Sequence, residues 1–217
     1  MNEDFYVLLT IDPATSTGYS LTKISTNWKK AEIYKYGFID IDNSSIFQGD
    51  HCIDLMKKLQ RIIDKHQVGY IAIEDYMFSR RFRQGSTVNV AFRTAIHILA
   101  RQNNIEYTIL GISDWKKYIA GYIRPSKEQT KKWGREAAKK LYIQQALWDW
   151  YGFRFPNHSI SHATGRPICF RYDICDVVGQ TVYYCEMLCG TSKIKLSVKI
   201  PPDVIFKRSP KKNFVYN

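Results

Sequence analysis

The sequence contains no uninterrupted hydrophobic run close to the roughly 20 residues that a membrane-spanning helix requires. Its first residues, MNEDF, are acidic and resemble neither a secretory signal peptide nor a transit peptide. These two absences predict a soluble intracellular protein that is not exported and has no membrane partner.

Cysteine is scarce, and the five cysteines are an odd number spread through apolar stretches: Cys52, Cys169, Cys175, Cys185 and Cys189. This pattern is typical of reduced core residues rather than of a disulfide framework. The spacing of His158, His162 and Cys169 matches no standard zinc site, so we do not expect zinc there.

Acidic residues are outnumbered, with 20 Asp and Glu against 32 Lys and Arg, which gives a net charge of +12. Such a balance says little about the fold but favours a polyanionic partner, with nucleic acid as the first candidate. At 217 residues and 45% hydrophobic, the chain is long enough for one well-filled core. We expect one domain over residues 1–190, followed by a basic tail over residues 191–217.

Hydrophobic periodicity predicts an α/β domain. The first 41 residues have the β-branched and aromatic character of three antiparallel strands. Further along, strands are expected at 68–75 and 105–110, and helices at 50–66, 86–103, 114–121, 126–150 and 172–190. Residues 151–170 lack a clear period and are expected to form an ordered loop or insertion. This order of elements describes a mixed sheet covered by helices.

Acidic residues stand where this architecture would bring them together. Asp12 ends the first strand, and Glu74 ends the strand YIAIE. Asp173 and Asp176 are three residues apart, on one face of the last helix that is not its apolar stripe. Converging carboxylates repel one another unless a hard cation with oxygen ligands joins them, and Mg²⁺ or Mn²⁺ fits best. Two such ions roughly 4 Å apart hydrolyse phosphodiesters in known enzymes.

Each acid also has an ordinary structural explanation. A carboxylate at a strand end is most often a turn residue or a helix cap, and Asp75 is an equally acidic neighbour of Glu74. The pair Asp173 and Asp176 would suit the start of a solvated helix. Two strand-end acids followed by a helical D-x-x-D are much less easily explained by chance than any one of them.

The stretches TIDPATSTGYSL, GYIAIEDYMF and YDICDVVGQTVYY resemble the three acidic motifs of the RuvC-type Holliday junction resolvases. The stretch SDWKKYIAGYIRPSKEQT resembles the lysine-bearing segment of that family. The likeness runs from about residue 6 to residue 190 and leaves residues 151–170 and the tail uncovered. Ala14 stands where the family usually has Gly, and the last motif is poorer in Ala, but no carboxylate is lost.

The resemblance implies an RNase H-like fold, with a mixed five-stranded sheet flanked by helices. It implies a homodimer that cuts symmetric strands at a four-way DNA junction, with the dimer interface on the helix at 86–103. It also implies two Mg²⁺ or Mn²⁺ ions per site, held by Asp12, Glu74, Asp173 and Asp176. The long segment before the last motif indicates a divergent branch of the kind found in phages, large DNA viruses or organelles. The expected compartment is the cytoplasm, or a viral replication site if the protein is viral.

Two groups of basic residues are expected to contact DNA. By the resemblance, Lys127 neutralises charge at the scissile phosphate and Lys116 contacts the junction backbone, although lysines on amphipathic helices are usually only solvated. The stretch MFSRRFRQ alternates aromatic residues with arginines, which suits stacking on unpaired bases. Its expected DNA contacts are Phe78, Arg80, Arg81 and Arg83, while Phe78 and Phe82 suit a core or dimer contact equally well.

Other functions remain open on the residues alone. The start IDPATSTGYSL also suits the first phosphate-binding strand of the sugar kinase and actin-like ATPase superfamily, but the second phosphate motif and the adenosine motif are missing. An RNA-cleaving or transposase-like nuclease of the RNase H-like group would carry similar acids and a similar basic surface. A non-catalytic nucleic-acid binding module with incidental acids is the alternative that is not an enzyme.

Overall fold

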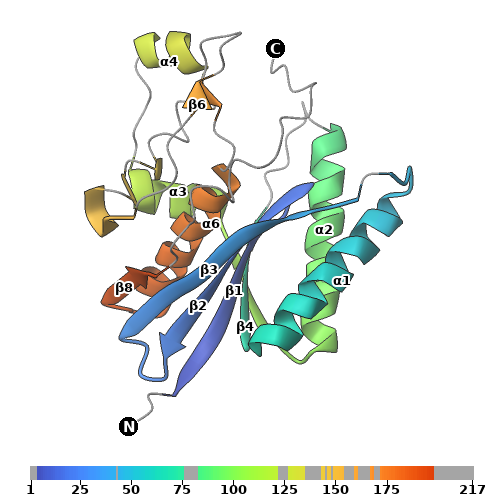
Figure 1. Ribbon diagram of the computed structural model, residues 1–217, viewed down its shortest axis with the longest axis horizontal. Coiled ribbons are helices and arrows are strands. Elements are labelled where there is room, and N and C mark those ends of the chain that lie inside the picture. The colour runs from blue at the N-terminus through green and yellow to red at the C-terminus, as the bar shows by residue number, and fades with distance from the viewer. Residues whose placement is uncertain are drawn as a thin grey trace.

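The computed structural model describes residues 4–42, 44–75, 83–121, 127–134, 143–144, 146–147, 149–153, 159–160, 167–168 and 172–197. At 83–86, 129, 132–133, 159–160, 167–168 and 172–173 it describes the backbone alone. The fold is a six-stranded sheet in the order β5-β4-β1-β2-β3-β8, with α1 and α2 on one face and α3 and α6 on the other (Figure 1). The expected mixed α/β sheet flanked by helices is thereby confirmed.

The strands of the sheet are β1 (Phe5–Asp12), β2 (Ser16–Ser25), β3 (Lys30–Asp40), β4 (Tyr70–Glu74), β5 (Glu106–Leu110) and β8 (Lys193–Leu196). A separate antiparallel pair is formed by β6 (Ser159–Ile160) and β7 (Pro167–Ile168). The helices are α1 (Gln48–His66), α2 (Arg83–Gln102), α3 (Ile112–Ala120), α4 (Lys127–Trp133), α6 (Tyr172–Tyr183) and the π-helical η1 (Tyr184–Leu188).

The directions of the strands determine which strand ends lie together at one edge of the sheet. The strands β1, β2 and β3 form an antiparallel meander, and β4 and β5 continue the sheet parallel to β1. The carboxyl ends of β1 and β4 therefore lie at the same edge of the sheet (Figure 1). Since ligands of open α/β sheets bind outside the carboxyl ends of the strands, this edge is the place to look for a site.

The sixth strand corrects the expected count of five. Residues 193–196 fall inside the segment 191–217, which was expected to be a basic tail, yet they form β8 and pair in parallel with β3. Ile194 and Leu196 turn inward against the core while Lys193 and Lys195 stay exposed. The ordered fold thus extends past residue 190, and the rest of the expected tail lies outside the described residues.

Alternation along β1 divides the core between the two faces of the sheet. Val7, Leu9 and Ile11 are buried in the cluster under α1 and α2. Leu8 points the other way and packs with Cys185 of η1. Because successive side chains of a strand point to opposite faces, every even-numbered residue of β1 faces the α6 layer.

The helical residues at 172–188 match the expected last helix, whereas the helix expected from 126 to 150 is interrupted. The helix α4 ends at Trp133, because Gly134 adopts a left-handed φ of 80° that stops the helix. Helical residues recur between 143 and 151. Phe153, in the expected insertion at 151–170, is buried in the core beside α6, so the start of that segment belongs to the domain. Within the described residues, the helices are too short or too polar to cross a membrane.

Candidate active site

Two of the expected acids end neighbouring strands. In the parallel pair of β1 and β4, Ile11 stands opposite Ile73, so Asp12 and Glu74 are the next residues on each strand. Both side chains are half-buried. As even positions that continue the alternation of Leu8 and Ala72, they face the α6 layer. The strand register therefore sets two carboxylates side by side on one face of the sheet edge.

The helix α6 crosses this face in the direction opposite to β1. The Thr181 hydroxyl oxygen lies 2.9 Å from Thr10 Oγ1 and 2.6 Å from Ser20 Oγ, in the middle of the sheet. Further along the helical chain, Cys185 packs against Leu8, nearer the start of β1. The N-terminal half of α6 consequently lies toward the end of β1.

This direction carries the third acid toward the first two. Asp176 precedes Thr181 by more than one turn of α6, on the side of Asp12, and is only 4% exposed. Asp173 lies one turn earlier on the same helix, but its side chain is outside the described part of the structure. Among the described side chains, no group of three or more His, Cys, Asp or Glu is close enough to hold a metal ion. The donor set consists of carboxylates alone, which is the chemistry that Mg²⁺ and Mn²⁺ prefer.

Trp115 of α3 binds one of these acids, a contact that the sequence did not predict. Its indole Nε1–H donates a hydrogen bond of 2.8 Å to Glu74 Oε1. The ring is fully buried and passes close to Gly179 of α6, where Cζ3 lies 3.0 Å from the position that a Cβ would occupy. Lys116 Nζ lies 4.9 Å from the centre of the same ring. One oxygen of Glu74 is thus held by a hydrogen bond, while none is recorded for its second oxygen among the described residues.

The acidic neighbour of Glu74 has a different role. Asp75 forms an ion pair with Arg93 of α2, and its backbone N–H donates to the Leu110 carbonyl at 2.8 Å. These contacts tie the end of β4 to α2 and to β5. Of the two consecutive acids, the structure therefore places Glu74, and not Asp75, on the α6 face beside Asp12.

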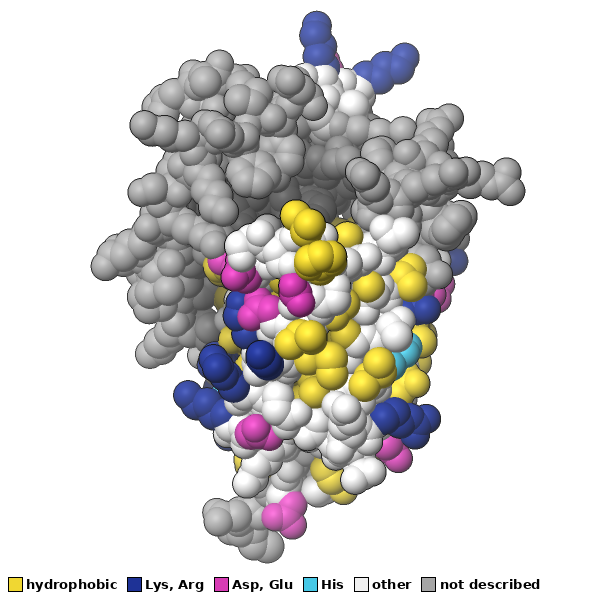
Figure 2. Space-filling view, turned by 90° about the vertical axis from the view of Figure 1, so that its right-hand side faces the viewer, with side chains coloured by type: hydrophobic (Ala, Val, Ile, Leu, Met, Phe, Trp, Pro, Cys, Tyr) yellow, Lys and Arg dark blue, Asp and Glu magenta, His cyan; other side chains and the backbone are white. Residues whose placement is uncertain are grey.

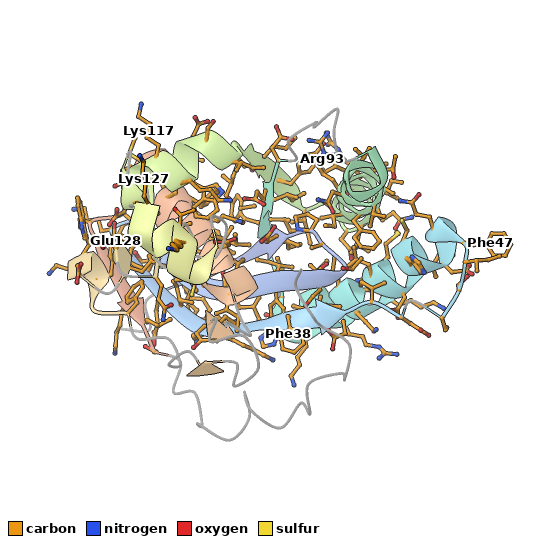
Figure 3. All side chains as sticks on the ribbon, turned by 90° about the horizontal axis from the view of Figure 1, so that it is seen from above. Phe38, Phe47, Arg93, Lys117, Lys127 and Glu128 are labelled. Carbon is orange, nitrogen blue, oxygen red and sulfur yellow. The ribbon has the colours of Figure 1, made fainter. Side chains whose placement is uncertain are left out.

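The two lysines that were expected to contact DNA lie on α3 and α4, the helices that follow β5 in the chain. Lys116 is half-buried on α3, and Lys127 is exposed at the first position of α4. Figure 3 views the molecule from the end at which β1 and β4 finish and shows Lys127 and Lys117 on the side of α3 and α4. Of the other expected DNA contacts, Phe78, Arg80 and Arg81 lie outside the described residues, and so does the side chain of Arg83.

A second polar cluster consists of hydrogen bonds to Glu186 of η1. The hydroxyls of Tyr118 and Tyr151 donate to the same carboxylate oxygen of Glu186, at 2.7 Å and 2.6 Å. Burial and the neighbouring Glu186 carboxylate raise the pKa of Tyr118 to about 12. Both tyrosines therefore stay protonated and act as donors at neutral pH. Their hydrogen bonds connect α3 and Tyr151 to η1.

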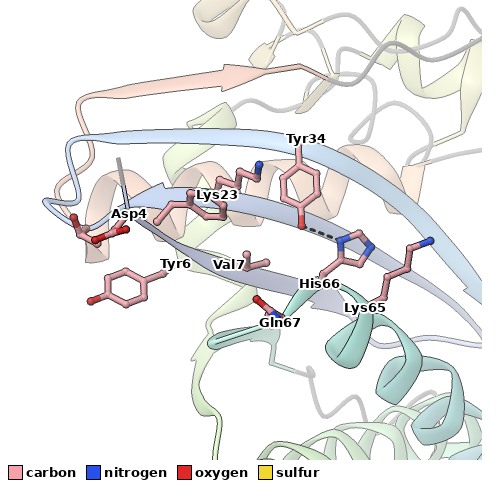
Figure 4. Close-up of a pocket in the computed structure, with 10 residues that line it drawn as sticks. Asp4, Tyr6, Val7, Lys23, Tyr34, Lys65, His66 and Gln67 are labelled. Carbon is pink, nitrogen blue, oxygen red and sulfur yellow. Dashed lines mark hydrogen bonds between the residues drawn. The ribbon is translucent and has the colours of Figure 1, made fainter. Parts of the chain in front are cut away.

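A pocket of about 960 Å³ opens at the far end of β1, beside Asp4 and Val7 (Figure 4). Its wall includes Lys23 and the pair formed by the Tyr34 hydroxyl and His66 Nδ1, which are 3.1 Å apart. This pocket lies at the opposite end of β1 from Asp12. None of the residues expected to be functional lines it, so it is separate from the candidate active site.

Comparison with known proteins agrees with this arrangement. A sequence profile described as Crossover junction endodeoxyribonuclease RuvC matches residues 8–139. The chain is 33% identical over 129 residues to the Crossover junction endodeoxyribonuclease RuvC of Caldicellulosiruptor saccharolyticus, which covers 58% of this chain and 74% of that relative. It is 32% identical over 127 residues to the protein of the same name from Helicobacter pylori strain G27, which covers 56% of this chain and 75% of that relative.

Among solved structures, T. thermophilus RuvC in complex with Holliday junction substrate superposes with a TM-score of 0.55 at 14% identity, covering 85% of this chain and 97% of that one. This likeness confirms the RNase H-like fold. The profile match includes Asp12, Glu74, Lys116 and Lys127, whereas the helical acids lie beyond it. With more than half of its length matched by the profile, the chain belongs to the crossover junction endodeoxyribonuclease RuvC family.

Proposed function

We propose that this protein is a structure-selective, metal-dependent endodeoxyribonuclease that resolves four-way DNA junctions by paired hydrolysis of symmetric phosphodiesters. The observation that carries the proposal is the pair of carboxylates, Asp12 and Glu74, on adjacent strand ends of a chain with a net charge of +12. Family membership supports the reaction class, and the related T. thermophilus protein was solved with a Holliday junction substrate.

Four residues are proposed to hold the metal: Asp12, Glu74, Asp173 and Asp176. A pair of Mg²⁺ or Mn²⁺ ions bound there would activate a water and stabilise the leaving oxygen of the cleaved phosphodiester. The chain itself supplies the alignment. Strand register sets the first two acids side by side, α6 carries the third toward them, and the Trp115 indole fixes the orientation of Glu74.

The DNA is proposed to approach the carboxyl edge of the sheet, where α3 and α4 present lysines. Lys116 and Lys127 supply phosphate contacts at this edge. The segment with Phe78, Arg80, Arg81 and Arg83 begins in the sequence a few residues after Glu74, the last residue of β4. We propose that this segment stacks on unpaired bases at the centre of the junction.

Lys127→Ala is expected to slow single-turnover cleavage of a four-way junction by about 10- to 100-fold, because a cation near the scissile phosphate stabilises the transition state. Junction affinity should fall no more than about threefold, since a single phosphate contact is lost. Rapid-quench cleavage and gel-shift titration measure the two quantities. Lys131→Ala on the same helix is the matched control, because Lys131 is also exposed. An unchanged cleavage rate for Lys127→Ala would remove Lys127 from the site.

The protein is further proposed to act as a homodimer. Hydrophobic side chains gather on the face formed by α1 and α2 (Figure 2), where Ile53 and Ile98 are exposed on the two helices. Burial of such a face against a second copy would remove apolar surface from water. A dimer would also provide two active sites, one for each of the strands to be cut.

Ile98→Asp is expected to convert the dimer to a monomer, because a carboxylate would be buried in the interface. Ile98 is 47% exposed in the single chain, so the substitution should leave the folded monomer intact. Analytical ultracentrifugation checks the result. Met187→Asp is the control, since Met187 is 55% exposed on η1, on the other face of the sheet. A monomeric wild-type protein, or a dimeric Ile98→Asp variant, would contradict the proposed interface.

Junction selectivity is the property that separates this proposal from a related RNA-cleaving or transposase-like nuclease. The purified protein is incubated with Mg²⁺ and labelled duplex, flap, three-way and four-way DNA, and the nicks are mapped. Paired, symmetric and ligatable nicks confined to the four-way substrate support a resolvase. Equal cutting of duplex, or preferential cutting of RNA, would move the protein to one of the other classes.

A further inference from the structure

One buried polar side chain of α6 has no hydrogen-bond partner within the described ranges of the chain. Gln180 on α6 is 0% exposed, and neither its amide nitrogen nor its amide oxygen has a hydrogen-bond partner among the described residues. Burial of an amide without hydrogen bonds is unfavourable, and most buried amides in proteins are hydrogen-bonded. The described part of the fold therefore does not account for a glutamine here.

The position of Gln180 points to the candidate active site. It follows Asp176 by four residues on α6, so the two side chains are neighbours along one face of the helix. The preceding residue, Gly179, packs against Trp115, which donates to Glu74. The residue after Gln180 is hydrogen-bonded to β1. The residues on either side of Gln180 thus contact the indole that holds Glu74 and the strand that ends in Asp12.

Apart from Asp176 and Thr181, the neighbours of Gln180 on α6 are apolar, and the Thr181 hydroxyl is already hydrogen-bonded to Thr10 and Ser20. Val177, Val178 and Val182 are all buried, and they pack without any hydrogen-bonding requirement. A methionine would have nearly the same length and flexibility as a glutamine and would fill the space without burying an amide. A polar group retained in such surroundings suggests a ligand that is bound in the working protein.

We propose that Gln180 is a positioning residue of the carboxylate site, whose amide holds an ordered water between α6 and the acids that bind the divalent cation. This inference rests on the proposed function. An amide offers both donors and acceptors, and a buried water needs two to four polar partners, which carboxylate oxygens can complete. Hydrogen bonds of this kind fix the orientation of ligating carboxylates and raise metal affinity.

The test replaces Gln180 with methionine in the full-length protein. Gln180→Met is expected to weaken Mn²⁺ binding by about tenfold, measured from the electron paramagnetic resonance signal of free Mn²⁺. Its thermal unfolding midpoint should be unchanged or higher, because an unpaired buried amide is removed. Gln144→Met is the matched control, since the amide oxygen of Gln144 is also buried without a partner among the described residues but lies in the segment 143–151. The control should bind Mn²⁺ as the wild type does.

Three results would overturn the inference. Unchanged Mn²⁺ affinity in Gln180→Met would show that the amide does not serve the site, and a lowered unfolding midpoint would assign it to the fold. The Mn²⁺ binding that is lost in Asp12→Asn is the binding that belongs to the carboxylate site. If the wild-type protein shows no such Mn²⁺ binding, the inference is overturned as well. Wild-type protein that binds Mn²⁺ at this site and cuts no junction would contradict the proposed function alone.

Discussion

Glu74→Gln is expected to bind a four-way junction with nearly wild-type affinity and to cut it on the order of a thousandfold more slowly, or not at all. The substitution keeps the size of the side chain and the acceptor for the Trp115 indole, but it removes the negative charge that a divalent cation requires. Loss of a metal ligand forfeits several kcal/mol of transition-state stabilisation, which corresponds to this factor in rate. Single-turnover cleavage with Mg²⁺ and gel-shift binding with Ca²⁺ measure the two effects.

The neighbouring acid provides the control for this experiment. Asp75→Asn removes a carboxylate at the next position of the chain, but Asp75 is paired with Arg93 and faces away from Asp12. Its cleavage rate should stay within a few-fold of the wild type. Cleavage by Glu74→Gln at the wild-type rate would refute the assignment of the site and would favour a nucleic-acid binding module with incidental acids.

Trp115→Ala is expected to lower the free energy of unfolding by about 3–5 kcal/mol, a large part of the stability of a domain of this size. Trp115 is the largest fully buried side chain among the described residues. Its loss would open a cavity between α3 and Gly179 of α6 and would leave Glu74 without its donor. Urea unfolding followed by circular dichroism measures the change.

Trp150→Ala is the control for the loss of a tryptophan, because Trp150 is 75% exposed. Its effect should remain within about 0.5 kcal/mol, as is usual for surface substitutions. Equal destabilisation by the two alanine variants would show that Trp115 is not the packing centre of the α3 and α6 layer.

Most helices and strands could be predicted from their hydrophobic pattern, whereas strand β8 and the break after α4 could not. The helix expected at 50–66 is α1, because Leu55, Leu59 and Ile63 recur at helical spacing and face the sheet. Strand β8 was missed, since four residues with alternating lysines carry little local signal and depend on pairing with β3, far away in the sequence. The break after α4 depends on one glycine, Gly134, at a left-handed φ.

The strand-end acids of the candidate site could be located from sequence, because a carboxylate that ends a buried strand stands out. The residues that support them could not. The contact between Trp115 and Glu74 joins positions 41 apart in the chain, and no local pattern encodes it. A glutamine one turn after Asp176, between the apolar residues Val178 and Val182, was the available signal for Gln180. The metal-binding and DNA-binding roles of the named residues remain predictions.

Strand β8 also bears on how the protein avoids self-association through its sheet. It covers residues 30–33 of β3, whose backbone N–H and C=O groups would otherwise form an open border of the sheet. Along these residues β8 becomes the border of the sheet, and Lys193 and Lys195 place charge on it. Short edge strands that carry lysines discourage the pairing of one sheet with the edge strand of another chain. A chain shortened at residue 190 would expose residues 30–33 of β3 to intermolecular strand addition, even though every acid of the candidate site would still be present.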